Sequence, residues 1–195
     1  HHWRRRVSFR KGNMTEPSDI HTFWFGKEPY ERRDVWFQGG PEFDDACRQF
    51  QPHWEKAHAG ALDHWLETPE SLLDFVILTD QIPRNIFRED ARSFATDGRA
   101  LAAAQHAVAK GWDKAMHEFE AVFLYLPYEH AEDIDIQNEC VRLYTALGGA
   151  GWMEFVIKHQ EIIQQFGRFP HRNAVLGRQS TPEEIAFMEA HGRGF

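Results

Sequence analysis

Apolar side chains recur along this chain at spacings of three and four residues, and stretches of strict apolar–polar alternation are nearly absent. The first spacing places side chains on one face of an α-helix, whereas alternation is typical of β-strands. The pattern therefore predicts an all-α protein. Proline and glycine positions divide it into predicted helices over residues 20–25, 41–66 (one or two helices), 69–82, 97–110, 112–126, 131–147, 152–166 and from 182 onward, with a loop over 27–40.

Several predicted helix ends carry recognisable signals. Thr68-Pro69 offers an N-cap oxygen followed by proline in the first turn, and Thr181-Pro182-Glu183-Glu184 has the form of a capping box. Pro83 and Pro127 are expected to end the helices before them, because proline has no N–H to donate and its ring collides with the preceding turn.

The connections between these helices are short, which favours antiparallel neighbours. We therefore expect a single domain of stacked antiparallel helical hairpins over residues 14–195. The segment from Leu72 to Leu78 is apolar on most sides, so its helix is expected to be central. Among the residues of the segment 41–66, five are expected to face the core: Phe43, Phe50, Trp54, Leu62 and Trp65. No 34-residue period is visible, so the pattern alone does not predict a regular repeat array.

Polar residues stand on the apolar faces of three predicted helices. In the helix over 152–166, His159 falls on the face that Trp152, Phe155 and Val156 define. We therefore expect it to be buried, with Asp80, His130 or Arg172 as its polar partner. The same alignment holds on two further helices: His130, Asp133 and Gln137 on the helix over 131–147, and Asp80 and Arg84 at the end of the helix over 69–82. Burying polar groups is costly unless they bind one another, water or a ligand, which predicts that these groups converge.

Three short segments carry a resemblance. They are Asp80-Gln81-Ile82-Pro83-Arg84-Asn85, Leu126-Pro127-Tyr128-Glu129-His130-Ala131-Glu132-Asp133, and Phe166-Gly167-Arg168-Phe169-Pro170-His171-Arg172-Asn173 followed by Leu176-Gly177-Arg178. With them the chain resembles, over residues 18 to about 190, a mainly bacterial family known as domain of unknown function 924. The resemblance implies a tetratricopeptide-like helical superhelix and brings no established activity with it.

These residues predict a polar pocket at one end of the helices. Two Pro-terminated helices each present Arg and Asn, whose planar groups suit a carboxylate or phosphate, and histidines can move protons near neutral pH. The candidate ligand-binding residues are Asp80, Arg84, Asn85, Asp133, Arg168, Arg172 and Asn173, and the candidate catalytic residues are His130, Glu132 and His159. An alternative is that the same groups form a buried network of ion pairs that only fixes the packing of the helices.

Two functions fit such a pocket. The first is a helical binding module for a small anionic ligand or peptide, and the second is a small hydrolase or lyase that acts on an anionic metabolite. We predict neither a metal nor another cofactor, because the 29 residues that separate His130 from His159 are not a metal-binding signature.

Charge and composition disfavour some classes of binding partner and indicate a compartment. The first thirteen residues carry five basic residues and no acidic ones, and we interpret residues 1–13 as an expression tag or a disordered extension. Without them the formal net charge falls from −8 to −13, which disfavours nucleic acid because its phosphates repel an acidic surface. The longest apolar helical run, residues 121–126, is far shorter than a membrane span. With only two cysteines, the chain is expected in the cytoplasm.

Overall fold

The computed structural model describes residues 16–192, and well over half of these are helical, with no strand among them. The prediction of an all-α protein is confirmed. The α-helices are α2 (Pro17–Phe25), α3 (Val35–Gln38), α4 (Pro41–Cys47), α5 (Gln51–His58), α6 (Pro69–Val76), α7 (Ile82–Ile86), α8 (Asp97–Ala109), α9 (Glu118–Glu129), α10 (Ile134–Leu147), α11 (Ala150–Phe166) and α12 (Pro182–His191). A π-helical turn (Ile77–Gln81) joins α6 to α7, and 3-10 turns cover Arg48–Phe50, Asp63–Glu67, Ala91–Phe94, Trp112–Ala115 and Pro170–Arg172.

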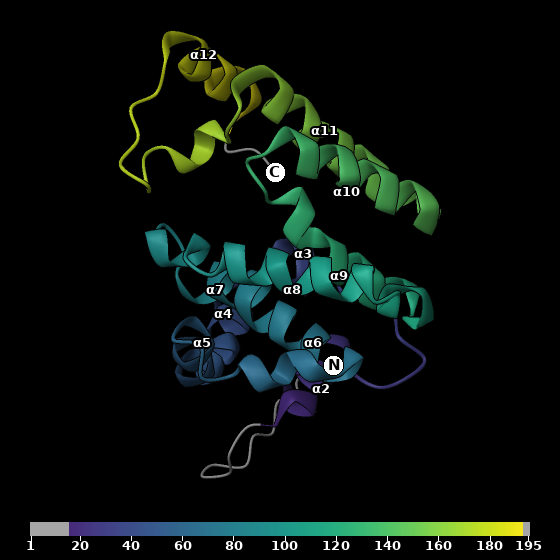
Figure 1. Cartoon of the computed structure of the whole chain (residues 1–195). Helices are drawn as coiled ribbons and strands as arrows, with labels where there is room; N and C mark the ends of the chain where they lie inside the picture. The colour runs from purple at the N-terminus through teal and green to yellow at the C-terminus, as the bar shows by residue number, and fades with distance from the viewer. Residues whose placement is uncertain (1–15, 193–195) are drawn as a thin grey trace.

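Helix α9 lies in the middle of the molecule. It packs against α6 and α8 on one side and against α10 and α11 on the other. Figure 1 shows α10 and α11 side by side above α9, with the shorter N-terminal helices below it. The successive contacts of α9, α10 and α11 fit stacked hairpins, and the finer expectation of a tetratricopeptide-like superhelix stays a prediction.

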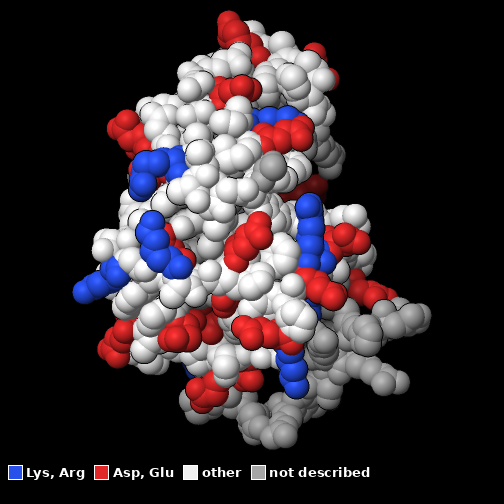
Figure 2. All heavy atoms as spheres, turned by 90° about the vertical axis from the view of Figure 1, so that its right-hand side faces the viewer, with Lys and Arg blue, Asp and Glu red and all other residues white. Residues whose placement is uncertain are grey.

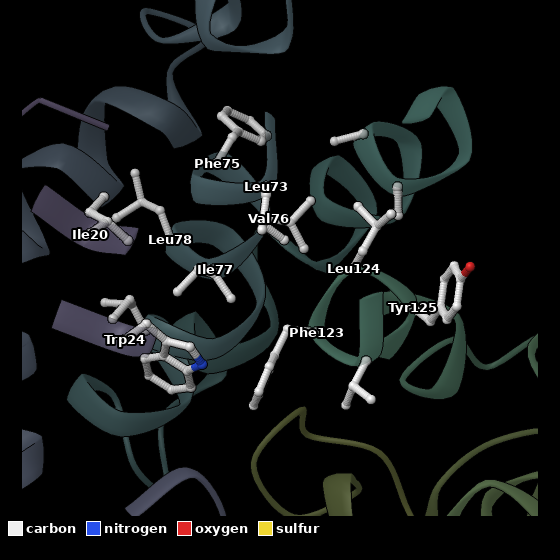
Figure 3. Close-up of a cluster of buried hydrophobic side chains, with 14 of the residues drawn as sticks. Ile20, Trp24, Leu73, Phe75, Val76, Ile77, Leu78, Phe123, Leu124 and Tyr125 are labelled. Carbon is white, nitrogen blue, oxygen red and sulfur yellow. The ribbon is translucent and has the colours of Figure 1, made fainter. Parts of the chain in front are cut away.

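Aromatic side chains from distant parts of the sequence build the core. Trp24 of α2 meets Phe123 of α9 edge-on, with 5.5 Å between ring centroids. Figure 3 shows Ile77 of the π-helical turn near both rings and Val76, the last residue of α6, beside it. The five residues of segment 41–66 that we expected inside are all buried. Each such side chain stabilises the fold by roughly 1.5–3 kcal/mol through removal of apolar surface from water.

Pro83 does not end its helix, contrary to the prediction. The chain stays helical through the π-turn and α7, where Pro83 occupies the first turn. An α-helical N–H at position 83 would bond the carbonyl of Thr79, and that carbonyl instead accepts a hydrogen bond from Thr96 Oγ1 at 2.6 Å. The wider turn lets the Ile82 N–H donate to the carbonyl of Ile77, five residues back.

Pro127 does not end its helix either. It lies inside α9, which runs on to Glu129, and the next helix begins at Ile134 and not at residue 131 as predicted. The missing N–H affects one carbonyl, that of Phe123, and packing of the buried Pro127 and Tyr128 rings offsets the loss. Asp133 caps α10 through a bond from the Ile136 N–H.

Other local predictions have mixed outcomes. Thr68 caps α6 and Thr181 forms the predicted capping box of α12. The predicted loop over 27–40 contains the short helix α3, and Phe155, which we expected to face the core, is 44% exposed. Phe155 lies on the outer edge of the α11 face, beside a cavity and not beneath a neighbouring helix.

Charges are dispersed over the surface. Figure 2 shows acidic side chains spread across the face in view, with basic side chains among them.

Within residues 16–192, no helix is both long and apolar enough to cross a membrane. Cys47 and Cys140 are buried as free thiols. The prediction for residues 1–13 lies outside the described residues.

Candidate functional site

A cavity of about 290 Å³ lies between α9 and α11, with residues of α3 and α10 completing its wall. Most of its lining is apolar and aromatic: Trp36, Phe37, Val122, Phe123, Leu126, Trp152, Phe155 and Val156. Its polar lining comprises Arg32, Gln81, Arg84, Glu129, His130, Tyr144 and His159. An apolar space with a few polar groups is the usual form of a small-molecule site.

Helical periodicity explains which side chains face this cavity. Val122, Leu126 and Glu129 follow one another on α9 at spacings of four and three residues, and α11 presents Trp152 and His159 seven residues apart. A rise of ~1.5 Å per residue makes seven residues about 10 Å long. The cavity therefore extends about 10 Å along the two helices, from an aromatic end to a polar end.

At the polar end, the ring of His130 is held by Asp80. Nδ1 of His130 lies 2.8 Å from Oδ1 of Asp80, which is fully buried. A carboxylate only accepts, so Nδ1 donates and Nε2 carries the lone pair. Burial and the nearby Arg84 lower the pKa of His130, which leaves the ring neutral at pH 7. Burial alone would raise the pKa of Asp80, but His130 and Arg84 outweigh it and keep Asp80 ionised.

Glu129 is the second titratable group at this end. It is the last residue of α9 and is 6% exposed, and no described residue donates a hydrogen bond to its carboxyl group. Burial, with a further contribution from the Asp80 anion, raises the pKa of Glu129 to about 8. At pH 7 Glu129 is therefore mainly a neutral carboxylic acid facing the cavity.

His159 reaches the same end from α11. Its side chain is 12% exposed, so the prediction that the ring avoids solvent is confirmed. Nδ1 lies 2.7 Å from the Phe155 carbonyl and 3.8 Å from Oε1 of Glu129, and the ring centroid is 6.5 Å from that of His130. Burial lowers the pKa of His159 to about 3, so this ring is also neutral at pH 7.

The two arginines expected to bind an anion do lie close together, but they share a carboxylate of the chain itself. Arg84 binds Asp97 through two hydrogen bonds of 2.7 and 2.9 Å. Nη1 of Arg172 lies 3.7 Å from the same carboxylate, and its guanidinium also stacks on Phe94 and Phe169. The pKa of Arg172 is lowered to about 10, mainly by burial and secondly by the neighbouring Arg84. Arg172 therefore remains charged at pH 7.

Glu132 belongs to a different set of contacts. Arg178 binds it through two hydrogen bonds of 2.9 and 3.0 Å, and the Phe169 N–H donates to it at 2.7 Å. These bonds join the α9–α10 connection to the segment that follows α11. Glu132 lines a neighbouring cavity of about 450 Å³ and does not line the cavity between α9 and α11.

Four of the candidate residues are not brought to the polar end. Asn85 bonds the Gln81 carbonyl and accepts from Arg88, and Asp133 is exposed at the start of α10. Arg168 pairs with Glu184, and Asn173 donates to the same carboxylate. The predicted convergence is therefore wrong for these four residues, because each is used where its own helix or turn begins or ends.

At the aromatic end, Arg32 stands beside the cavity. Its guanidinium carbon lies 4.8 Å from the centre of the Phe37 ring and 5.1 Å from that of Trp152. Arg32 is exposed, and within residues 16–192 no carboxylate forms an ion pair with it. This cation is therefore available to a ligand, unlike the guanidinium groups of Arg84 and Arg172.

The comparisons with known proteins agree with one another. The model of a family described as a bacterial protein of unknown function, DUF924, matches residues 20–192. The chain belongs to the DUF924 family. It is also similar to a solved structure of ATU0120 from Agrobacterium tumefaciens, itself a protein of unknown function, with 40% identity and a TM-score of 0.82 over 89% of this chain and 97% of that one. No curated protein matches the chain.

Three residues of this DUF924 chain that shape the region were missed by the sequence analysis. Glu129 was overlooked because a helix ending before Pro127 leaves it in a loop, whereas a helix through Pro127 places it on the face of Val122 and Leu126. Arg32 precedes α3 in a stretch without helical periodicity, so no pattern places it. Asp97 was taken only as a helix start.

In the described part of the chain, no group of three or more His, Cys, Asp or Glu side chains could hold a metal ion.

Proposed function

We propose that this DUF924 chain binds a small organic ligand, with an apolar body and an anionic group, in the cavity between α9 and α11. The observation that carries the proposal is the exposed guanidinium of Arg32, which lies over the neighbouring rings of Phe37 and Trp152 at one end of an apolar cavity. An anion bound there gains a charge-assisted hydrogen bond, while the rings exclude water from it.

The other arginines of the region are less suited to bind an anion. Three guanidinium groups near the polar end face three carboxyl groups of the chain, so their formal charges cancel: Arg84, Arg172 and Arg178 with Asp80, Asp97 and Glu132. An anion would have to displace a carboxylate that is already bound through two hydrogen bonds. We therefore assign the anionic group of the ligand to Arg32.

The size and rim of the cavity favour a small molecule over a peptide. A volume of about 290 Å³ is at the lower end of the usual range for small-ligand pockets. Two large apolar side chains that are well exposed, Phe37 at 48% and Phe155 at 44%, both line this cavity. Exposed aromatic rings around one opening are typical of a binding site.

Titration calorimetry with matched probes tests the proposal. We expect 4-butylbenzoate, or a homologue from a series of phenylalkyl carboxylates, to bind, and the corresponding neutral amides to bind at least about tenfold more weakly. Arg32→Met should remove this preference for the carboxylate. Arg48→Met, the same change at an exposed arginine outside the cavity, should leave it unchanged. Binding of amides and carboxylates with equal affinity, or no binding by the whole series, would contradict the proposal.

A second candidate function, catalysis of a hydrolase or lyase type on the bound ligand, is favoured by the hydrogen bond between His130 and Asp80. A buried carboxylate that fixes one nitrogen of an imidazole leaves the other nitrogen directed and basic, as in many acid–base sites.

A further inference from the structure

Three titratable side chains meet at the polar end of the cavity, and together they allow proton transfer in addition to binding. His130, Glu129 and His159 all line it, and Asp80 holds the ring of His130 from the buried side. Among the described residues, the same lining contains no serine, threonine or cysteine, and its one hydroxyl group, that of Tyr144, is buried and donates to the Val122 carbonyl at 2.7 Å. A covalent route through a hydroxyl or thiol nucleophile is therefore not available here, whereas proton transfer is.

We propose that His130 and Glu129 form a general acid–base centre that removes a proton from the carbon next to a carbonyl group of the bound ligand. The inference rests on the proposed function, since the ligand must first occupy the cavity. Its substrate class is a ketone or aldehyde that also carries a carboxylate or a similar anion about 10 Å away, the length of α11 between Trp152 and His159.

The step balances within the site. Nε2 of His130 takes the proton, so that one C–H bond breaks and one N–H bond forms. Glu129 gives its carboxyl proton to the carbonyl oxygen, which yields an enol, an imidazolium and a carboxylate. When the imidazolium returns its proton to the same carbon and Glu129 takes back the enol proton, the ketone is regenerated. When a group instead leaves the neighbouring carbon with the imidazolium proton, and Glu129 takes back the enol proton, an elimination is complete and both residues regain their first state.

The geometry assigns the two roles. His130 donates through Nδ1 to Asp80, so Nε2 holds the lone pair, and this nitrogen forms no hydrogen bond to a residue within 16–192. Glu129 is a neutral acid at pH 7 and has no hydrogen-bond donor among those residues. The negative charge that forms on Glu129 would be stabilised by two positive charges, those of the new imidazolium and of Arg84, which is part of the same lining. His159 is neutral and contributes shape and polarity.

Exchange of hydrogen for deuterium in heavy water tests the inference without knowledge of the natural substrate. The probe is 4-(3-oxobutyl)benzoate, whose ketone and carboxylate stand at opposite ends of an apolar body, and proton NMR follows its positions next to the carbonyl. We expect the wild-type chain to accelerate this exchange over buffer. Glu129→Gln and His130→Asn should each reduce the acceleration about 100-fold or more, the usual contribution of a general acid or base.

Matched variants and binding data separate the possible failures. Glu161→Gln and His106→Asn alter exposed residues outside the cavity and should leave the exchange unchanged. Glu129→Gln is nearly isosteric and should still bind 4-butylbenzoate, so its loss of exchange cannot reflect unfolding. The rate should also fall above about pH 8, where Glu129 loses its proton.

Three outcomes would overturn the inference. If the wild type binds the probe through Arg32 without accelerating exchange, the acid–base centre is refuted and the binding function stands. If exchange survives in both variants, these two residues are not the acid and the base. If neither probe binds, the proposed function fails together with the inference.

Discussion

The titration of Glu129, at the carboxyl end of α9, makes the free energy of unfolding depend on pH. Its pKa is raised to about 8 by burial and by the Asp80 anion, above the value of the unfolded chain. A raised pKa stabilises the folded state below the unfolded value, and this contribution is lost as pH rises through about 8. As the pH rises from 5 to 9, we expect the free energy of unfolding of Glu129→Gln to increase relative to that of the wild type by on the order of 1–3 kcal/mol. Urea unfolding at each pH measures this difference.

Comparison with the variant isolates this effect, because His130 and His159 have lowered pKa values and influence stability in the opposite direction. The carboxyl resonance of Glu129, followed by carbon NMR, gives its pKa directly. A midpoint near the ordinary value for glutamate, or a stability difference that does not change with pH, would show that Glu129 is ionised and solvated in the folded chain.

Individual residues were predicted unevenly. The placement of His159 was correct because helical spacing from Trp152 and Val156 defines a face without knowledge of the rest of the fold. The roles of Asn85 and Asn173 were not predictable, since spacing does not say whether an amide at a helix end bonds its own turn or a ligand. Here both bond nearby groups of the chain.

At the scale of elements, the junction of α6 and α7 depends on one hydroxyl group. Thr96 Oγ1 donates to the Thr79 carbonyl and accepts from Nε1 of Trp54 at 3.0 Å, and all three residues are buried. Thr96→Val keeps the shape and leaves two buried polar groups without a partner. We expect it to lower the free energy of unfolding by roughly 2–4 kcal/mol, measured by chemical denaturation.

A second threonine provides the control. Thr145 bonds the Val141 carbonyl within its own exposed helical turn, so Thr145→Val should change the free energy of unfolding by less than about 0.5 kcal/mol. Equal effects of the two substitutions would mean that the bridge from Thr96 to the π-turn contributes nothing specific.

Element boundaries were predicted well where a cap defines them and poorly at proline. Thr68 and Thr181 mark helix starts because their side chains bond the first-turn N–H groups. Pro83 and Pro127 were taken as ends because the local cost of proline is known, but the compensation comes from distant residues. The hydroxyl that replaces the missing donor at Pro83 comes from Thr96, thirteen positions later, and no local pattern reveals it.

At the scale of the whole molecule, Glu132 joins the α9–α10 connection to the segment after α11. It accepts two hydrogen bonds from Arg178 and one from the Phe169 N–H. Burial alone would raise the pKa of Glu132, and these bonds outweigh it and lower the pKa. We expect Glu132→Gln to lower the free energy of unfolding by about 1–3 kcal/mol and to increase hydrogen exchange in residues 169–178.

The adjacent carboxylate is the matched control. Asp133 is exposed and only caps α10, a role that asparagine also fills, so Asp133→Asn should change stability by less than about 0.5 kcal/mol. If both substitutions have the same small effect, Glu132 does not hold the C-terminal segment.

The sequence indicated the helical class through spacings within single segments. It indicated the closeness of Arg84 and Arg172 because the same combination of Pro, Arg and Asn recurs at two predicted helix ends. It did not indicate that Asp97 pairs with both arginines or that Arg32 lies over Phe37 and Trp152, because both facts depend on how α3, α8 and α11 come together. The candidate site is therefore not a cluster of arginines but an apolar cavity, with Arg32 at one end and with Glu129, His130 and His159 at the other.

A crystal structure of the chain grown with 4-butylbenzoate would show whether the cavity between α9 and α11 binds an anionic ligand through Arg32. We expect the benzoate ring between α9 and α11, with its carboxylate on the guanidinium of Arg32 and its butyl chain directed toward Glu129 and His159. A probe whose carboxylate lies on Arg84 or Arg172 with Asp97 displaced, or an empty cavity at a saturating concentration of probe, would refute binding through Arg32.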